Sequence, residues 1–451
     1  MSRSEPIVSV SGMRGVVGKE LRPETVVCYV AAACHILPPG EVVVGRDSRP
    51  SGRIFYHAVL AALAACGRKA IDIGIVPTPT IGVVVRRSGA AGGVQITGSH
   101  NPPEQNGIKI LDAEGKMLPA EQAQELVQVF RQCRFAYATS AEGAGSHVAN
   151  RLAGLWHLSA VLDLVDVEAI RRRRFRVLLD ANGGAGGPLA QRLLKHLGCE
   201  VVGLYLDADG CFYHPPEPLA ENLLSVGEIV AASQVDAGFV LDPDADRLGV
   251  FDSCGKFLGE EYTLSLCLHH VLRKRRGPIV INCATSLMNE WIAAQFGVPC
   301  FRVPVGEANV VRGMREHGAI FGGEGNGGPI DPRVGWIRDS LVGIALILEA
   351  MATENASVRE LADQLPRFAM RKLKVSLASA DFAEKTERLI RMFPTARVDL
   401  SDGLRLAWDD RWLLCRPSNT EPVVRVIAEG PSDQVVDDLC SQALATLSAD
   451  S

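Results

Sequence analysis

The sequence contains few aromatic residues, no long hydrophobic run and no excess of positive charge. Aromatic side chains make up 6% of the 451 residues, and no apolar stretch has the length needed to cross a bilayer. The net charge is −5, whereas a nucleic-acid-binding surface requires clustered positive charge. We therefore expect neither a membrane nor a nucleic acid among the partners of this chain.

Closely spaced cysteine pairs are absent as well, and we expect no signal peptide. The 12 cysteines are scattered singly, a pattern that favours reduced, buried thiols over zinc sites or disulfides. The opening residues, MSRSEPIVSVSG, contain no apolar stretch of signal-peptide length. Together these features predict a cytoplasmic protein.

The pattern of apolar runs predicts several domains. The chain is far longer than one hydrophobic core usually supports, and 47% of its residues are hydrophobic. Three stretches, which begin near Val42, Phe175 and Pro278, share one order: an apolar run, a polar or glycine-rich turn, a helical segment that ends near glycine, and a second apolar run. This order is typical of strand–helix–strand units in parallel sheets, which place ligand-binding loops beyond the carboxyl ends of their strands.

From about Phe368 the pattern changes to one of antiparallel strands with flanking helices. Strands are expected within residues 372–377, 397–408, 411–417 and 423–430. The predicted fold is therefore α/β, with three similar mixed α/β domains and a C-terminal α+β domain around a central cleft. We expect linkers at 139–147, 251–256 and 364–367. The predicted domains are residues 1–145, 146–252, 253–366 and 367–451.

The segment TGSHNPPEQNGIKI, residues 97–110, follows an apolar run and contains a candidate nucleophile. Two prolines keep Ser99, His100 and Asn101 out of a helix, so the hydroxyl group lies on a stiff loop. Adjacent side chains on an extended chain point apart, so Ser99 and His100 do not form a protease-like dyad. A plain turn is the alternative interpretation.

The segment AGFVLDPDADRLGVFD, residues 237–252, brings three carboxylates to the end of an apolar strand. Asp242, Asp244 and Asp246 stand at alternate positions, a spacing that directs them to one side. Three like charges need a cation, and oxygen-only ligands favour Mg²⁺, Mn²⁺ or Ca²⁺. An EF-hand is excluded, because Arg247 stands at its sixth position and Ser253 at its twelfth. A solvated acidic turn is the alternative.

Two further loops have the composition of a sugar site and a phosphate site. FGGEGNGGPI, residues 321–330, surrounds Glu324 with glycines, which allow a ligand to approach closely while the carboxylate accepts hydrogen bonds from sugar hydroxyls. RPSNTEPVVRV, residues 416–426, combines guanidinium groups, hydroxyls and backbone amides, which suit phosphate. Its candidate ligands are Arg416, Ser418, Asn419, Thr420 and Arg425.

These four loops in this order resemble the α-D-phosphohexomutase family, which comprises phosphoglucomutases, phosphomannomutases and phosphoglucosamine mutases. The resemblance spans nearly the whole chain and includes SGMRGVVG near the start, residues 11–18. It implies an intramolecular phosphotransferase that interconverts hexose 1-phosphate and 6-phosphate through a phosphoserine and a bisphosphate intermediate. It also implies one Mg²⁺ per chain, a sugar bisphosphate as activator, and a monomer or homodimer.

The resemblance assigns roles to individual residues. Ser99 matches the phosphoserine and, with Asp242, Asp244 and Asp246, the Mg²⁺ ligands. His100 and Lys109 match acid/base positions, Arg14 matches an active-site arginine, and Arg247 lies beside the metal to face a phosphoryl oxygen. The sugar would be held by Glu324 and Asn326, and the non-reacting phosphate by the five candidate ligands of residues 416–426.

The choice of sugar and two other functional classes stay open at this point. Many relatives have Ser in place of Asn326 and glycines in place of Pro243 and Ala245; the form found here most resembles a prokaryotic branch assigned as phosphoglucosamine mutases. Phosphomannomutase and phosphoglucomutase are alternatives, and Glu307 is a candidate for contact with an amino sugar's ammonium. An aspartyl phosphohydrolase that uses DPDADR and a non-enzymatic sugar-phosphate-binding protein are the competing classes.

Overall fold

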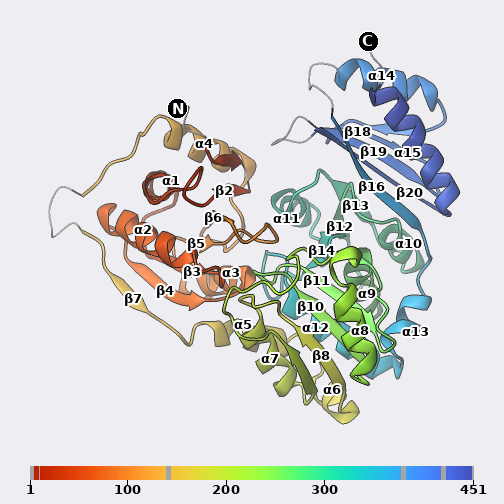
Figure 1. Ribbon diagram of the computed structural model, residues 1–451, viewed down its shortest axis with the longest axis horizontal. Helices are drawn as coiled ribbons and strands as arrows, with labels where there is room; N and C mark the ends of the chain where they lie inside the picture. Colours follow the sequence, from red (N-terminus) through yellow and green to blue (C-terminus); the bar gives the residue numbers. More distant parts are fainter. Residues whose placement is uncertain (1–4, 10, 139–143, 377–381, 418–422, 449–451) are drawn as a thin grey trace.

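Four sheets with their helices form the chain, which we describe from a computed structural model (Figure 1). The structure describes residues 5–9, 11–138, 144–376, 382–417 and 423–448. In this part of the chain no helix combines the length and the hydrophobicity needed to span a membrane.

The first sheet has seven strands in the order β1-β2-β6-β5-β3-β4-β7. Its predicted strand–helix–strand unit is β3–α2–β4, in which β3 pairs in parallel with β4 and β5. Successive residues of β3 face opposite sides, so Val42 and Val44 pack with α1 and α2 whereas Val43 packs with α3. The elements are β1 (Ile7–Ser9), β2 (Gly12–Val16), α1 (Pro23–Ile36), β3 (Val42–Arg46), α2 (Gly52–Ala65), β4 (Ala70–Ile75), α3 (Thr78–Ser88), β5 (Gly92–Ile96), β6 (Gln105–Leu111), α4 (Ala120–Arg131) and β7 (His147–Ala149).

The second sheet has the order β11-β10-β8-β9, with β11 as an antiparallel edge strand. The predicted unit from Phe175 is β8–α7–β9, and its two strands pair in parallel. The elements are α5 (Gly154–Leu162), α6 (Val167–Arg173), β8 (Arg176–Asp180), α7 (Gly187–His196), β9 (Glu200–Leu204), a 3₁₀ helix (Ala220–Asn222), α8 (Leu224–Ala232), β10 (Ala237–Leu241) and β11 (Leu248–Asp252). The expected linker at 251–256 is the end of β11 and a tight turn, in which Asp252 N donates to the Lys256 carbonyl.

The third sheet has the order β13-β12-β14-β15, and its unit from Pro278 is β12–α10–β13. The elements are α9 (Glu260–Lys274), β12 (Ile279–Asn282), α10 (Met288–Gln295), β13 (Cys300–Val303), α11 (Glu307–Glu316), β14 (Phe321–Glu324), β15 (Gly328–Ile330), α12 (Ser340–Glu354) and α13 (Val358–Asp363). Helix α12 is buried along most of its length and contributes to one apolar core that includes side chains of both the second and the third unit. These two units are therefore joined by a continuous hydrophobic core.

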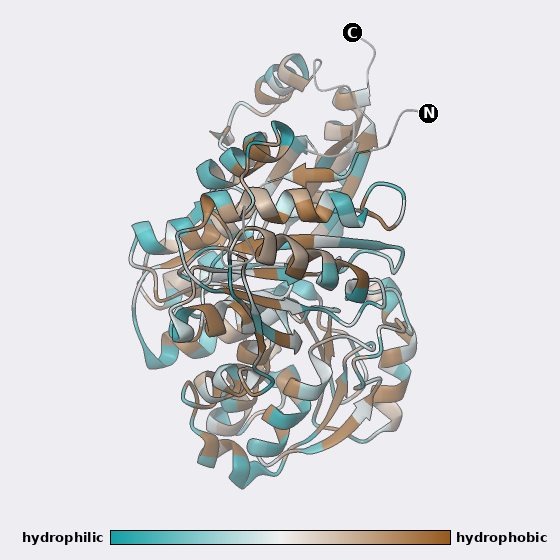
Figure 2. Cartoon of the chain, turned by 90° about the vertical axis from the view of Figure 1, so that its left-hand side faces the viewer, coloured by the Kyte–Doolittle hydropathy of each residue, from teal (hydrophilic) through white to brown (hydrophobic). Residues whose placement is uncertain are grey.

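The fourth sheet is antiparallel throughout, in the order β16-β20-β19-β18-β17, as the sequence predicts. Its elements are β16 (Ala369–Ser376), α14 (Phe382–Met392), β17 (Arg397–Asp399), β18 (Leu404–Ala407), β19 (Trp412–Pro417), β20 (Val423–Gly430) and α15 (Asp433–Ser448). The stretch 397–408, expected as one strand, is a hairpin of β17 and β18, because Gly403 adopts a φ of +84° that turns the chain. Figure 2 shows the apolar residues concentrated on the inner faces of helices and along the strands.

Candidate active site

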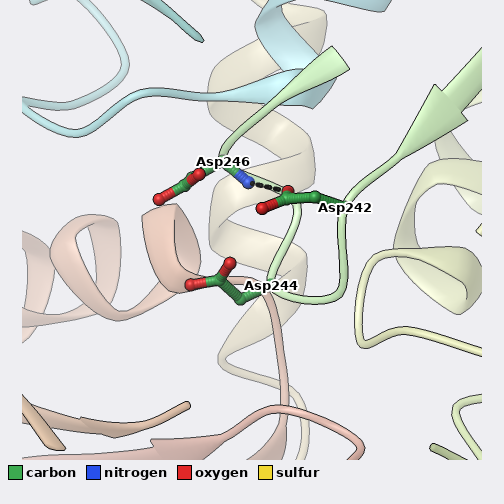
Figure 3. Close-up of side chains that lie close together, drawn as sticks. All are labelled: Asp242, Asp244 and Asp246. Atoms are coloured by element: carbon green, nitrogen blue, oxygen red, sulfur yellow. Dashed lines mark hydrogen bonds between the residues drawn. The ribbon is translucent and has the colours of Figure 1, made fainter. Parts of the chain in front are cut away.

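The three aspartates of the metal loop converge between β10 and β11 (Figure 3). One carboxylate oxygen from each of Asp242, Asp244 and Asp246 lies within 4.8 Å of the other two. The loop is shaped by the backbone, because Asp242 Oδ1 accepts hydrogen bonds from the amides of Asp246 and Arg247, both at 3.0 Å. All three aspartates are at most 1% exposed.

The donor atoms of this loop fit a hard divalent cation. Asp242 Oδ2, Asp244 Oδ1 and Asp246 Oδ1 are buried and have no hydrogen-bond partner within the described ranges. Buried carboxylate oxygens are otherwise almost always paired, so three unpaired ones at a single place indicate a cation site. Burial and the two neighbouring carboxylates raise the pKa of Asp242 well above its ordinary value. A bound cation would oppose this shift by stabilising the ionised form.

Lys109 and Arg338 supply positive charge on the other side of the aspartates. Lys109 Nζ donates to Asp244 Oδ2 at 2.7 Å and to Asp246 Oδ2 at 3.2 Å. Arg338 Nη2 donates to Asp246 Oδ2 at 2.8 Å. Burial opposes the ionisation of Asp246, but Arg338 and Lys109 outweigh it and lower its pKa. Likewise, burial disfavours the Lys109 ammonium, yet Asp244 and Asp246 raise its pKa above the ordinary value.

Arg14 lies on β2, which pairs with β6, the strand that carries Lys109. Burial lowers the pKa of Arg14, and the charges of Asp244 and Asp246 act on it in the opposite direction. Arg14 stands directly opposite Gly107, which faces the same side of β6 as Lys109. The structure therefore brings Arg14 and Lys109 to the same cluster as the metal loop.

Ser99 follows β5 on a loop that is held in an unusual conformation. Its φ is +52°, in the left-handed region that residues with a Cβ rarely occupy. The conformation is stabilised by Thr97 Oγ1, which accepts a hydrogen bond from the Ser99 amide at 2.8 Å, and by Arg49. Arg49 donates to the carbonyls of Ser99, Asn101, Pro102 and Gln105 at 2.6–3.1 Å.

Asp47 in turn forms an ion pair with Arg49, the arginine that binds this loop. Its Oδ2 accepts from Arg49 Nε at 3.1 Å and from Thr97 Oγ1 at 2.7 Å. Asp47 and Arg49 are both almost fully buried. The serine loop therefore rests on a buried ion pair that is contributed by residues immediately after β3.

His100 connects the serine loop to the metal loop. Its Nε2 lies 3.3 Å from Arg247 Nη2, and its Nδ1 lies 3.3 Å from Ser99 Oγ. The expectation that the side chains of Ser99 and His100 point apart is therefore wrong, because the left-handed φ of Ser99 bends the chain that was expected to be extended. Because a guanidinium can only donate, Nε2 is the acceptor and Nδ1 carries the proton that faces Ser99. Burial and the neighbouring Arg247 lower the pKa of His100 well below its ordinary value, which keeps the ring neutral. Arg247 is itself oriented by Glu217, which accepts from Nη1 at 2.7 Å.

Arg338 organises the sugar-type loop at the end of β14. Its Nη1 donates to Glu324 Oε2 at 2.8 Å and to Asn326 Oδ1 at 3.3 Å, while its Nε donates to Glu307 Oε2 at 3.1 Å. The other oxygen of Glu324 accepts from Asn282 Nδ2 at 2.8 Å. Through Arg338 the structure brings Glu324, Asn326 and Glu307 to the aspartate cluster.

Arg416 and Arg425 stand directly opposite each other on β19 and β20. Directly paired residues share a face of the sheet, so both guanidinium groups extend from one side. Arg416 Nε donates to Asp402 Oδ1 at 2.7 Å, and the second oxygen of Asp402 accepts from Val305 N at 2.9 Å. Asp402 thereby links the fourth unit to the third. Ser418, Asn419 and Thr420 lie outside the described residues.

Several residues that shape this site were not identified from the sequence. Asp47 and Arg49 could have been identified as candidates, because RDSR follows an apolar strand just as the serine and aspartate loops do. Nothing in the sequence pointed to Thr78 and Arg338, because their partners in the aspartate loop lie far away in the sequence. Thr78 Oγ1 donates to Asp244 Oδ2 at 2.5 Å. The predicted central cleft and the roles of the individual residues stay predictions.

Comparison with known proteins identifies the family. Four consecutive segments match Phosphoglucomutase/phosphomannomutase alpha/beta/alpha domains I, II and III and the C-terminal domain, at residues 6–136, 156–255, 260–368 and 373–445. The chain therefore belongs to the phosphoglucomutase/phosphomannomutase family of phosphohexomutases, which are isomerases that transfer a phosphoryl group within a sugar phosphate. This confirms the predicted family, fold class and enzyme class. The predicted domain boundaries remain predictions.

Relatives cover almost the whole chain. A "Phosphoglucomutase/phosphomannomutase" of Thermococcus kodakarensis is 35% identical, and the match covers 94% of each chain. A "Probable phosphoglucosamine mutase" of Methanopyrus kandleri is 33% identical, again with 94% of each chain covered. The crystal structure of a phosphoglucomutase/phosphomannomutase family protein from Burkholderia thailandensis superposes with a TM-score of 0.85 at 30% identity, covering 98% of this chain and 99% of that one.

Proposed function

We propose that this chain interconverts the 1-phosphate and 6-phosphate of a hexose through a phosphorylated Ser99, with glucosamine phosphate as its preferred substrate. The observation that supports this best is the single cluster formed by the aspartate loop, Lys109 and Arg338, which His100 and Arg247 connect to Ser99. Phosphoryl transfer depends chiefly on positioning and on neutralising charge, and this cluster supplies both.

The metal would be held by the unpaired oxygens of Asp242, Asp244 and Asp246, together with an oxygen of the phosphorylated Ser99. When bound, a magnesium ion neutralises charge on the transferred phosphoryl group. Oxygen-only ligands of this kind suit Mg²⁺. A magnesium-dependent phosphohexomutase is therefore the proposal that fits both the family and the donor atoms.

Each transfer exchanges one P–O bond for another. A sugar hydroxyl attacks the phosphorus on Ser99 and the bond from phosphorus to Ser99 Oγ breaks. The proton lost by the sugar hydroxyl is balanced by the proton that Ser99 Oγ gains, and the products are a sugar bisphosphate and the free Ser99 hydroxyl. His100 Nδ1–H donates to Ser99 Oγ and so stabilises charge on that oxygen as the phosphoryl group leaves. After the bisphosphate reverses its orientation, its other phosphate returns to Ser99. An exogenous sugar bisphosphate would act as an activator by phosphorylating Ser99.

Lys109, Arg14 and Arg247 surround the transferred group with positive charge. The ammonium of Lys109 is held between two carboxylates, and its proposed acid/base role depends on access of the sugar oxygen to Nζ. Arg416 and Arg425, on paired strands, would bind the phosphate that does not react. Glu324 and Asn326 would accept hydrogen bonds from the sugar hydroxyls.

Glucosamine is favoured by relatives and by one acidic side chain. Several relatives that match nearly the whole chain bear the name "Probable phosphoglucosamine mutase". Glu307 lies beside Glu324 through their shared contact with Arg338. Its second oxygen, Oε1, makes no hydrogen bond to any residue that the structure describes and is therefore available to an ammonium group.

A side-by-side rate comparison tests the proposal. The enzyme, Mg²⁺ and a trace of sugar bisphosphate are incubated with glucosamine, glucose or mannose 1-phosphate, and the 6-phosphate is quantified. We expect the highest kcat/KM for glucosamine phosphate; a higher value for glucose or mannose would overturn the sugar assignment. Release of free phosphate in step with substrate loss, without an isomer, would overturn the enzyme class in favour of a phosphohydrolase. Absence of turnover together with tight substrate binding would favour a binding protein.

A further inference from the structure

A cavity lies between the first and second units, outside the candidate active site. Its volume is about 680 Å³, within the usual range of small-molecule pockets. It is bordered by the ends of β3 and β4 and by the first turns of α2, α5 and α7. None of the residues that the sequence assigned to catalysis, metal or sugar lines it.

The lining of this cavity carries an excess of positive charge. Four arginines, Arg46, Arg53, Arg151 and Arg192, contribute to it, and the one carboxylate among the lining residues is Asp72. Arg151 binds that carboxylate with both terminal nitrogens, at 3.0 and 2.7 Å. Three guanidinium groups are therefore left without a carboxylate from the cavity wall.

Those three guanidinium groups make few direct contacts with the rest of the protein. Arg46 Nη1 donates only to the carbonyl of Asp47, at 3.3 Å. The guanidinium groups of Arg53 and Arg192 make no hydrogen bond or ion pair to any residue that the structure describes. Burial lowers the pKa of Arg46; the charges of Asp47 and Asp72 oppose this, and the like charges of Arg151 and Arg53 lower it again. The arginines are thus close enough to repel one another, a repulsion that an anion between them would relieve.

Three helices direct their amino termini at the same cavity. Helices α2, α5 and α7 begin at Gly52, Gly154 and Gly187, and none of them has a side-chain cap. The first amides of α2 and α5 already donate to carbonyls of the preceding turn, so the contribution of these helices to anion binding is the positive end of the helix dipole. Arg46 adds positive charge at the start of α2, because its side chain lies against Gly52. Its Cδ is 3.6 Å from the position that a Cβ on Gly52 would occupy.

We propose that this cavity binds a small molecule that carries two or more phosphate groups. Three guanidinium groups that bind no carboxylate, together with the amino-terminal ends of three helices, match a diphosphate better than a single monoanion, and guanidinium groups bind phosphate oxygens in pairs. The volume exceeds that of inorganic phosphate and accommodates an organic group beside the diphosphate. Tyr56 and Leu155 provide an apolar wall for such a group.

The cavity adjoins the back of the metal loop. Pro77 lines it, and the amide of the next residue, Thr78, donates to the Asp244 carbonyl at 2.9 Å. Ala185 also lines it and donates to the Pro243 carbonyl at 2.8 Å. The wall of the cavity thus bonds directly to the backbone of the loop, while the carboxylates belong to the candidate active site.

Calorimetric titration of the full chain with inorganic pyrophosphate and with uridine diphosphate tests the proposal. The test variant is Arg53→Ser/Arg192→Ser, and the matched control is Arg87→Ser/Arg131→Ser, which removes two exposed arginines from the ends of α3 and α4. The side chains of Arg53 and Arg192 support no described contact, so the test variant should keep the wild-type melting temperature and its mutase rate without added anion.

We expect one saturable site in the wild type and in the control, and at least tenfold weaker binding in the test variant. Tighter binding of uridine diphosphate than of pyrophosphate would identify a nucleotide as the ligand source, and equal affinities would identify the diphosphate itself. Equal affinity in the test and control variants would overturn the proposal, because the probe would then bind elsewhere. Absence of saturable binding to the wild type would overturn it as well.

Discussion

Replacing Arg338 by Met should destabilise the protein strongly, because one guanidinium neutralises three carboxylates. Arg338 lies 2.8 Å from Asp246, 2.8 Å from Glu324 and 3.1 Å from Glu307, and its side chain is 11% exposed. These ion pairs raise the pKa of Arg338, against the effect of burial. Methionine has a similar length and no charge, so the variant leaves the carboxylates facing one another without their shared partner.

The loss follows from the cost of an unpaired buried charge. Removing one partner of a buried ion pair typically costs about 3–5 kcal/mol. For a cooperative unit of the size formed by the second and third sheets, about 2–4 °C of melting temperature is lost per kcal/mol, so we expect a decrease of about 6–20 °C. Differential scanning calorimetry without added Mg²⁺ measures this decrease.

Two further variants keep this prediction specific. Arg367→Met removes an arginine that pairs with Asp363 at 2.6 Å, but both side chains are largely exposed, so we expect a loss below about 1 kcal/mol. Adding Glu307→Gln to Arg338→Met removes one uncompensated charge and should restore part of the stability. A melting temperature of Arg338→Met within 2 °C of that of Arg367→Met would refute the reasoning.

Three other variants test separate parts of the structure. A Cβ on Gly325 would lie 1.8 Å from Glu261 Oε2, so Gly325→Ala should lower kcat/KM about 100-fold by displacing the sugar loop; wild-type kinetics would contradict this. Burial raises the pKa of Glu261 from 4.5 to about 7, so the folded chain retains a proton that the unfolded chain releases. The free energy of unfolding should therefore fall by about 3 kcal/mol as the pH rises from about 4.5 to 7. Urea titrations at several pH values measure this pH dependence, which Glu261→Gln should weaken; an unchanged pH dependence would exclude Glu261 as its source. Arg49→Lys keeps the charge beside Asp47 but loses the forked contacts to four carbonyls, so kcat should fall about tenfold or more with a small change in melting temperature; an unchanged kcat would show that the serine loop does not depend on the fork.

The features that were predictable from the sequence are those encoded within one short segment. Each strand–helix–strand unit has its own hydrophobic period, and the three aspartates directly follow the strand that positions them. The antiparallel C-terminal sheet was predictable for the same reason, although Gly403 divides residues 397–408 into two strands. Local periodicity contains this information because it reflects which face of an element is buried.

Contacts between distant segments were not predictable from one sequence. Arg338 joins Asp246, Glu307 and Glu324, which come from a loop, a helix and a strand, and nothing in their spacing indicates a common partner. The apolar core shared by the second and third units depends on α12, whose burial on most sides becomes evident only from the packing. The contacts of Asp402 were unpredictable for the same reason, since its two oxygens bind Arg416 of the fourth unit and the backbone amide of Val305 in the third unit.

Phosphorylation of Ser99 is the most direct test of the proposed mechanism. The enzyme is incubated with a sugar bisphosphate and Mg²⁺ and then digested, and the phosphorylated peptide is located by mass spectrometry. We expect phosphate on Ser99 and a decrease in kcat of about 1000-fold or more in Ser99→Ala. Ser88→Ala, whose hydroxyl bonds only to carbonyls of its own helix, should remain fully active. An active Ser99→Ala enzyme, or a wild-type enzyme that turns over without phosphate on this serine, would contradict the account.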